Sequence, residues 1–133
     1  MALNSKKILI IDDNEEQLLL ARTYLSSFGY EVTTTTEVTC IPLVMSFQPH
    51  LILVDINMPD MSGDKLVRIF NHSPGFLDRS AVLLYSALEE NALGVIARST
   101  GASGWVSKNQ DISCLLEEVR KWMLVAEERR GES

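Results

Sequence analysis

The sequence has little cysteine, no long apolar run and a deficit of basic residues. Its two cysteines, Cys40 and Cys114, lack the spacing of a metal site. We expect both to be small hydrophobes in a reducing compartment rather than a disulfide. After Lys7 a run of only four apolar residues leads to Asp12, which is too short for the core of a signal peptide, and no stretch approaches a membrane span. These features predict a cytoplasmic protein.

The charge and length of the chain indicate which partners and how many domains to expect. The 12 Lys and Arg against 18 Asp and Glu leave a net charge of −6. Nonspecific nucleic-acid binding needs a basic surface that neutralises phosphates, so no direct nucleic-acid partner is expected. A chain of 133 residues is expected to form one domain. Its 46% apolar fraction is ordinary for a globular chain with its own core.

Short apolar runs alternate with amphipathic stretches along the chain. Continuous aliphatic runs at 8–11, 51–54 and 81–85 predict strands buried on both faces, and 30–35 and 105–106 predict two more. We expect helices between Asn14 and Gly29 and over 38–47, 63–71, 91–100 and 112–126. Strands that alternate with helices predict an α/β fold of five βα units, doubly wound around a parallel sheet.

Local signals add detail to this plan. Asn14, with Gln17 three residues later, resembles a helix cap, and Pro42 fits the helix over 38–47 only in its first turn. Gly94 weakens its helix by about 1 kcal/mol relative to alanine. His50 and a second histidine, His72, lie in predicted loops, so both are expected at the surface.

Polar residues follow the ends of the predicted strands. Asp12 and Asp13 follow the first strand, Asp55 the third, Ser86 the fourth and Lys108 the fifth. Ligands of doubly wound sheets bind beyond the carboxyl ends of the strands, so these side chains should share one crevice if the first and third strands are neighbours. Clustered carboxylates repel one another, and Mg²⁺ would neutralise them while keeping waters that a phosphate can replace. The set suits phosphoryl transfer to a carboxylate.

Four motifs together resemble the response-regulator receiver domains of two-component signalling. They are Asp12-Asp13, DINMPDMSG at 55–63, Ser86-Ala87 and GASGWVSK at 101–108. Each is weak alone, but their order is specific, and the likeness runs from about Lys6 to Trp122. It implies a flavodoxin-like three-layer sandwich with strand order 2-1-3-4-5. It also implies a receiver domain over 1–126, followed at 127–133 by a charged tail or the start of a linker.

The resemblance also implies roles for the site residues. Asp55 would be the phospho-acceptor, taking a phosphoryl group from the phosphohistidine of a sensor histidine kinase or a histidine phosphotransfer protein. Asp13 and Asp55 would ligate Mg²⁺ through carboxylates, Asp12 mainly through a water, and Asn57 through its backbone carbonyl. Lys108 would contact the phosphoryl group. Such domains catalyse their own phosphorylation and dephosphorylation but act mainly as signalling switches.

A switch is implied at Ser86 and Trp105. Ser86 would move to bond the phosphoryl group, and Trp105, at the aromatic switch position, would reorient with it; a fixed, half-buried Trp105 is the other interpretation. The face built by the fourth helix, the fifth strand and the last helix would then change and bind a downstream protein or output domain. Partners can include a phosphorylation-dependent dimer, and residues 17–24 are the implied kinase-docking region.

One departure from the family pattern concerns the loop that carries Lys108. Asn109 stands where the family usually has proline, which allows a cis peptide bond. A cis bond before Asn109 would cost about 3–4 kcal/mol. Either the loop keeps that strain, or the bond is trans and Lys108 shifts.

Three other interpretations compete with a phospho-accepting switch. A pseudo-receiver would act as a phosphorylation-independent interaction module, but it commonly lacks the acceptor, the acidic pair or the lysine, all present here. A haloacid-dehalogenase-type phosphatase carries its nucleophile after the first strand in a paired-aspartate motif, whereas Asp55 follows the third. Asp12, Asp13 and Asn14 alone could form only a helix-capping turn.

Overall fold

The computed structural model describes residues 6–36, 40–58, 63–72 and 79–131. Strands and helices alternate through these ranges as the sequence predicts. In chain order they are β1 Lys7–Ile11, α1 Glu15–Ser26, β2 Glu31–Thr35, α2 Ile41–Phe47, β3 Leu51–Val54, α3 Gly63–His72, β4 Ala81–Ser86, α4 Glu90–Thr100, β5 Gly104–Ser107 and α5 Ile112–Arg130.

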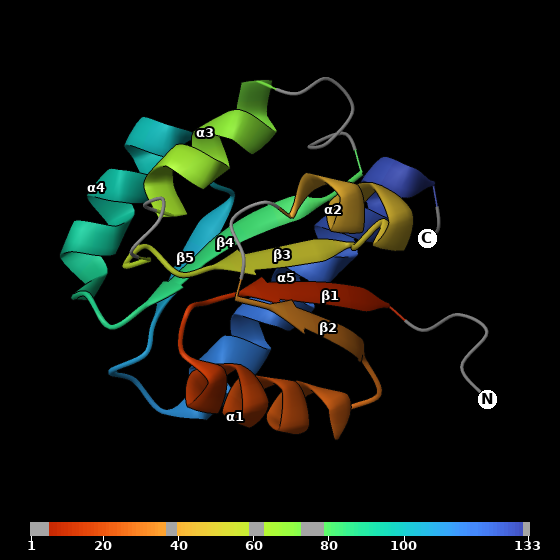
Figure 1. Cartoon of the computed structure of the whole chain (residues 1–133), viewed down its shortest axis with the longest axis horizontal. Coiled ribbons are helices and arrows are strands. Elements are labelled where there is room, and N and C mark those ends of the chain that lie inside the picture. Colours follow the sequence, from red (N-terminus) through yellow and green to blue (C-terminus); the bar gives the residue numbers. More distant parts are fainter. Residues whose placement is uncertain (1–5, 37–39, 59–62, 73–78, 132–133) are drawn as a thin grey trace.

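The described strands form one parallel sheet in the order β2-β1-β3-β4-β5 (Figure 1). This order confirms the flavodoxin-like arrangement. In the register, Ile11 of β1 lies opposite Val54 of β3, so the two strands end together. Asp12 and Asp55 each follow directly, and the adjacency of β1 and β3 therefore brings the two aspartates to the same edge.

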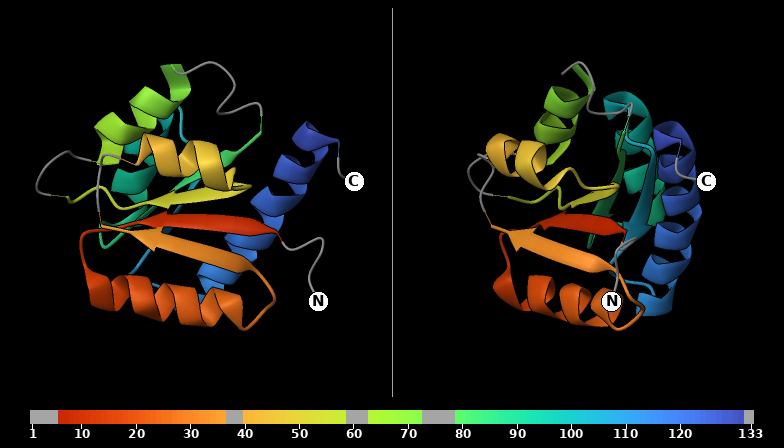
Figure 2. Two further views of the ribbon diagram at one scale, coloured as in Figure 1. Left: turned by 45° about the vertical axis from the view of Figure 1, so that its right-hand side comes forward. Right: turned by 90° about the vertical axis from the view of Figure 1, so that its right-hand side faces the viewer.

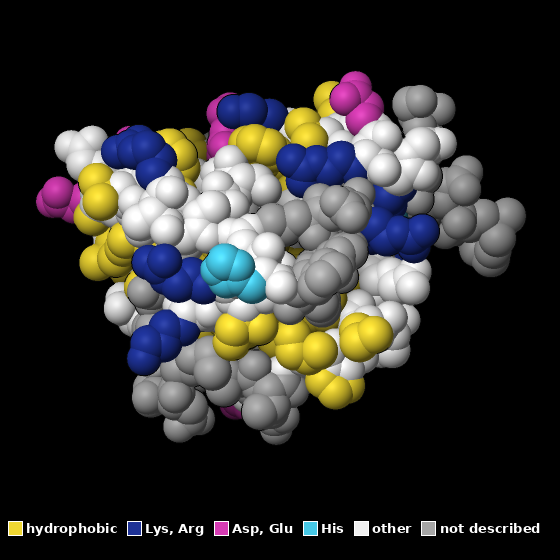
Figure 3. Space-filling view, turned by 90° about the horizontal axis from the view of Figure 1, so that it is seen from above, with side chains coloured by type: hydrophobic (Ala, Val, Ile, Leu, Met, Phe, Trp, Pro, Cys, Tyr) yellow, Lys and Arg dark blue, Asp and Glu magenta, His cyan; other side chains and the backbone are white. Residues whose placement is uncertain are grey.

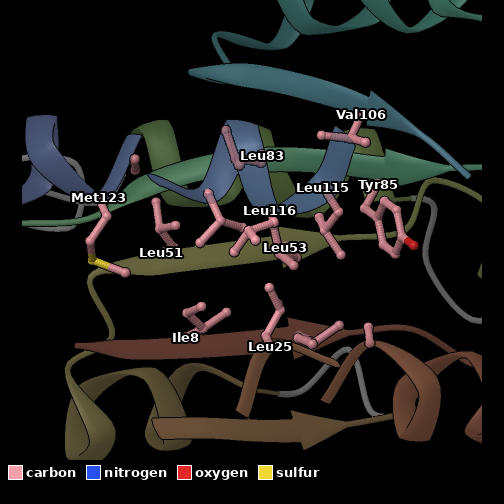
Figure 4. Close-up of a cluster of buried hydrophobic side chains, with 14 of the residues drawn as sticks. Ile8, Leu25, Leu51, Leu53, Leu83, Tyr85, Val106, Leu115, Leu116 and Met123 are labelled. Atoms are coloured by element: carbon pink, nitrogen blue, oxygen red, sulfur yellow. The ribbon is translucent and has the colours of Figure 1, made fainter. Parts of the chain in front are cut away.

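Helices cover both faces of the sheet, and alternate strand residues supply two separate cores. On one face, α1 and α5 pack on Ile8, Leu51 and Leu53 (Figures 2 and 4). On the other, α2, α3 and α4 pack on Leu9 and the remaining alternate positions. Side chains on both faces of β3 are fully buried. Burying a large aliphatic side chain contributes about 1.5–3 kcal/mol, so continuous apolar strands stabilise both layers.

Caps and turns set the ends of the first two helices. The Asn14 side chain accepts a hydrogen bond from the Gln17 backbone N–H at 3.1 Å, which confirms the predicted cap. Gly29 has φ +95°, a conformation that glycine adopts without steric cost. Helix α2 begins at Ile41 with Pro42 in its first turn, as Pro42 requires. The expected start at residue 38 lies outside the described residues.

The expectation of a surface histidine at position 50 is wrong. His50 is only 4% exposed, and its Nδ1 accepts a hydrogen bond from the Lys7 backbone N–H at 3.1 Å. The C-terminal end of α5 reaches over this loop, and Arg130 donates to the carbonyls of Gln48 and Pro49, each at 2.7 Å. The division expected after residue 126 is thus not marked by a break in α5. His72 is exposed as predicted, but it ends α3 instead of lying in a loop.

The two cysteines and the charged side chains complete the description of the fold. Cys40 is buried and Cys114 half-buried, and both are free thiols. In the described part of the chain, the helices are too short or too polar to cross a bilayer. On the face seen from above, Lys and Arg exceed acidic groups among the described side chains (Figure 3).

Candidate functional site

Three carboxylates meet where β1 and β3 end. Each of Asp12, Asp13 and Asp55 offers an oxygen within 4.8 Å of the others. Asp12 and Asp55 are buried, whereas Asp13 faces solvent. They open into a pocket of about 370 Å³. Its lining residues are Asp12, Asp13, Asn14, Gln17, Asp55, Asn57, Ala87, Lys108 and Asn109. The structure thus brings Asp12 and Lys108 together, although they lie 96 positions apart in the sequence.

Lys108 reaches into this cluster from the loop after β5. Its ammonium group lies 2.5 Å from Oδ2 of Asp12 and 4.0 Å from Oδ1 of Asp55. It also lies 5.3 Å from the centre of the Tyr85 ring, a cation–π distance. The Lys108–Asn109 peptide bond is trans. The absence of proline therefore does not carry the lysine out of the pocket.

Ser86 ends β4 with a hydroxyl that is buried without a partner. The residue is 0% exposed, and its Oγ has no hydrogen-bond partner among the described residues. Leaving a buried hydroxyl unpaired costs about 1–3 kcal/mol, so such atoms are uncommon unless a ligand or a movement satisfies them. Ser86 can therefore gain a hydrogen bond when an acceptor arrives at this edge of the sheet.

The electrostatics of the cluster centre on Asp55. Burial raises the pKa of its carboxyl to about 6 from an ordinary 3.8. Lys108 lowers this pKa and the neighbouring Asp12 raises it. The cluster therefore carries more negative charge than Lys108 alone neutralises. Carboxylate and carbonyl oxygens are the ligands that Mg²⁺ prefers, so the donor set of Asp12, Asp13, Asp55 and the Asn57 carbonyl fits such an ion.

The raised pKa predicts that Asp55→Asn stabilises the protein in EDTA. Well below pH 3.8, Asp55 is protonated in both the folded and the unfolded chain, so its burial costs no stability. Between pH 3.8 and about 6 the unfolded chain ionises first, so the folded state loses stability as the pH rises. At pH 7.5 the variant should gain about 2 kcal/mol in urea unfolding, and the gain should vanish at about pH 3.

Asp12→Asn is the matched control for this stability prediction. Asp12 is the carboxylate nearest Lys108, and its Oδ1 accepts a hydrogen bond from the Asn14 N–H at 3.0 Å. Removing that charge leaves the Lys108 ammonium less neutralised, so this variant should lose stability at pH 7.5. Equal stability of the Asp55→Asn variant and the wild type at pH 7.5 would contradict the assignment of an uncompensated charge to Asp55.

Trp105 lies half-buried against α4. It packs on the core beneath α2, α3 and α4. A Cβ added to Gly94 would lie 3.3 Å from the Trp105 ring, so the glycine makes room for the indole. From the sequence alone, Gly94 is predicted only to weaken its helix.

Two site residues were not found by reasoning from the sequence. Tyr85 lies beneath Lys108, but its place inside a buried strand marks it only as a core residue. Asn109 lines the pocket and donates from its side-chain amide to the Ala87 carbonyl at 2.6 Å. In the sequence, Asn109 is notable because it replaces a proline, and that replacement predicts a change in the peptide bond. It does not predict a contact of the side chain.

Comparisons with known proteins agree with this geometry. Residues 8–120 match the family model described as response regulator receiver domain. The response regulator PleD of Caulobacter vibrioides is 30% identical over 130 residues, which cover 95% of this chain and 28% of PleD. Hybrid signal transduction histidine kinase D of Dictyostelium discoideum is 30% identical over 79% of this chain, which spans 7% of the kinase.

Smaller proteins match over nearly their whole length. The polar-differentiation response regulator DivK of Brucella abortus is 24% identical, with 90% of this chain and 97% of DivK covered. Among solved structures, a response regulator from Chloroflexus aurantiacus superposes with a TM-score of 0.84 at 18% identity, over 91% of this chain and 99% of the other. TrrA of Thermotoga maritima, solved with Mg²⁺ and BeF, has a TM-score of 0.76 at 24% identity, over 88% and 98%.

Proposed function

The chain belongs to the response-regulator receiver domain family, and from this premise we propose that it is a phosphorylation-controlled switch with Asp55 as its phospho-acceptor. The observation that carries the proposal is one pocket in which Asp55 meets two further carboxylates and the Lys108 ammonium. The buried Ser86 hydroxyl, which has no hydrogen-bond partner among the described residues, lies at the end of β4, next in the chain to Ala87 of the pocket lining. This combination suits a reaction in which negative charge enters and must be neutralised.

The proposed reaction is a phosphoryl transfer onto Asp55. A carboxylate oxygen of Asp55 attacks the phosphorus of a phosphohistidine, a P–O bond forms, and the P–N bond breaks. The imidazole leaves with the electron pair and takes up a proton. Lys108, already 4.0 Å from Asp55, needs little movement to bond an incoming phosphoryl oxygen. Positioning and charge neutralisation supply most of the catalysis in such transfers.

Mg²⁺ is the cofactor that the donor set supports. Asp13 and Asp55 would hold it through carboxylates, Asn57 through its carbonyl and Asp12 mainly through a water. When bound, the ion neutralises charge that develops on the phosphoryl oxygens. Asp12 has a second task in this proposal, because its contact with Lys108 keeps the ammonium group at the pocket.

Phosphorylation would act as a switch through Ser86 and Trp105. The phosphate adds about −1.5 to −2 charge and new acceptor oxygens at Asp55. The unpaired Ser86 hydroxyl would turn toward these oxygens and vacate space near β5. Trp105 lies in β5 and packs on α4, so its reorientation would change the face made by α4, β5 and α5.

Two surfaces are proposed for partners. Leu19 and Leu20 of α1 are 64% and 55% exposed, and they suit docking of a histidine kinase or phosphotransfer protein. A groove of about 410 Å³, lined by Trp105 and Trp122 with acidic side chains at its rim, lies on the α4-β5-α5 face and suits a downstream protein or output domain. The proposal includes a cytoplasmic location and a dimer that forms on phosphorylation, without direct nucleic-acid binding.

Intact-protein mass after incubation with acetyl phosphate tests this function. We expect a single phosphoryl adduct with Mg²⁺ and none above background in EDTA, because the carboxylate cluster cannot accept more negative charge unaided. A known receiver domain serves as the control for reagent and timing. If the control is labelled and this protein is not, the proposal is wrong and the phosphorylation-independent interaction module replaces it.

A further inference from the structure

The loops that follow β4 and β5 are joined by hydrogen bonds to three successive carbonyls. The Lys108 N–H donates to the Ser86 carbonyl at 2.7 Å. The Asn109 side-chain amide donates to the Ala87 carbonyl at 2.6 Å, and the Ser107 hydroxyl donates to the Leu88 carbonyl at 2.8 Å. The loop that begins at Ser86 is thus fixed to the loop that carries Lys108.

Asn109 contributes to this junction in a way that proline cannot. Proline has neither a backbone N–H nor a donor in its side chain. Asn109 uses both: its N–H donates to the Ser107 hydroxyl at 3.2 Å, and its amide donates to Ala87. With a trans peptide bond before it, the loop still holds Lys108 beside Asp12 and Asp55. The hydrogen bonds of Asn109 thus fix the loop where the family usually has the rigid ring of a proline.

The Asn109 contact lies close to the reacting groups although the residue itself is exposed. Asn109 and Ala87 both line the pocket that holds Asp55. Ala87 follows Ser86 directly, and Asn109 follows Lys108. A single side-chain contact therefore links the residue next to the unpaired hydroxyl with the residue next to the ammonium group.

We propose that Asn109 is a positioning residue for phosphorylation, which keeps the Ser86 hydroxyl and the Lys108 ammonium in a fixed relation to one another through its bond to Ala87. This inference rests on the proposed function, because it concerns the same reaction. Asn109 acts on the reacting groups only through the two loops. Without its amide, each loop can move separately, and both groups spend less time where the phosphoryl group needs them.

The first test is the rate of phosphorylation by acetyl phosphate in Mg²⁺. We expect Asn109→Ala to lower the rate constant about three- to ten-fold, the factor that corresponds to one net hydrogen bond. Asn109→Gln keeps an amide donor and should recover part of the rate, whereas Asn109→Asp cannot donate and should recover none. Gln110→Ala is the matched control, because the bond from Gln110 to Ser107 comes from its backbone N–H.

Two further readouts separate positioning from a general loosening of the loop. Mg²⁺ affinity should stay within about two-fold of the wild type in Asn109→Ala, because Asn109 holds none of the carboxylates. In a double-mutant cycle, Ser86→Ala should slow the reaction less in the Asn109→Ala background than in the wild type. Additive effects of the two substitutions, or weakened Mg²⁺ binding, would show that Asn109 only stabilises the loop.

The outcomes distinguish this inference from the function on which it rests. A wild type that takes no label overturns the proposed function, and the role of Asn109 falls with it. A labelled wild type with an unchanged rate in Asn109→Ala overturns this inference alone.

Discussion

Lys108→Ala is expected to slow phosphorylation by acetyl phosphate about 100-fold or more. Removing one group that stabilises a developing charge usually lowers a rate constant by this factor. Lys108 is the cation next to the carboxylates, 2.5 Å from Asp12 and 4.0 Å from Asp55. Without it, the incoming phosphoryl oxygens meet excess negative charge. The measurement is the rate of adduct formation at saturating Mg²⁺, followed by intact mass.

Mg²⁺ binding separates this effect from a loss of fold. The ammonium group opposes a second cation in the same pocket, so Lys108→Ala should bind Mg²⁺ at least as tightly as the wild type. The matched control is Lys121→Ala, which removes an exposed lysine of α5. The control should phosphorylate within about two-fold of the wild-type rate, as exposed charges far from a site contribute little. Wild-type rates in Lys108→Ala would remove the lysine from the proposed chemistry.

Gly63→Ala is expected to lower the free energy of unfolding by about 2–4 kcal/mol. Losses of this size follow when an added atom overpacks a rigid interior. A Cβ on Gly63 would lie 2.0 Å from the backbone oxygen of Asp55. That neighbour is backbone, so it cannot turn aside as a side chain can. Either α3 moves away from β3 or the Asp55 backbone shifts. Urea unfolding measures the loss, and Mg²⁺ affinity should fall as Asp55 is displaced.

Gly131→Ala controls for the general cost of replacing a glycine. Gly131 has φ +73°, and within the described residues no atom lies within 4 Å of an added Cβ, so the left-handed conformation is what opposes a side chain there. At the end of α5 this should cost about 1–2 kcal/mol. A similar loss in both variants would mean that the close approach of Gly63 to Asp55 is not what requires glycine.

Much of the fold and the acidic cluster could be predicted from the sequence, because strand order carries so much information. Once β1 and β3 are neighbours in a parallel sheet, Asp12 and Asp55 must meet at one edge. The continuous apolar runs of β1 and β3 leave those strands few alternatives to burial on both faces. The polar residues that directly follow the other strands are then expected at the same edge, which accounts for most of the pocket lining.

Contacts that depend on distant packing could not be predicted. His50 is buried because the end of α5 folds over the loop before β3. The sequence around residue 50 does not indicate this contact with a helix far along the chain. Tyr85 supports Lys108 from within a strand whose residues all look like core. The hydrogen bond from Asn109 to Ala87 joins two loops 22 residues apart, which only the folded sheet brings together.

The most direct test of the central claim is to locate the phosphoryl group. Borohydride reduces an acyl phosphate to an alcohol, which leaves a permanent mark at the acceptor that peptide mass spectrometry can assign. After treatment with acetyl phosphate and Mg²⁺, we predict the mark at Asp55 and at no other carboxylate, with no mark in Asp55→Asn. A mark at Asp12 or Asp13 in the wild type, or label on a histidine with Asp55 unmodified, would contradict the account.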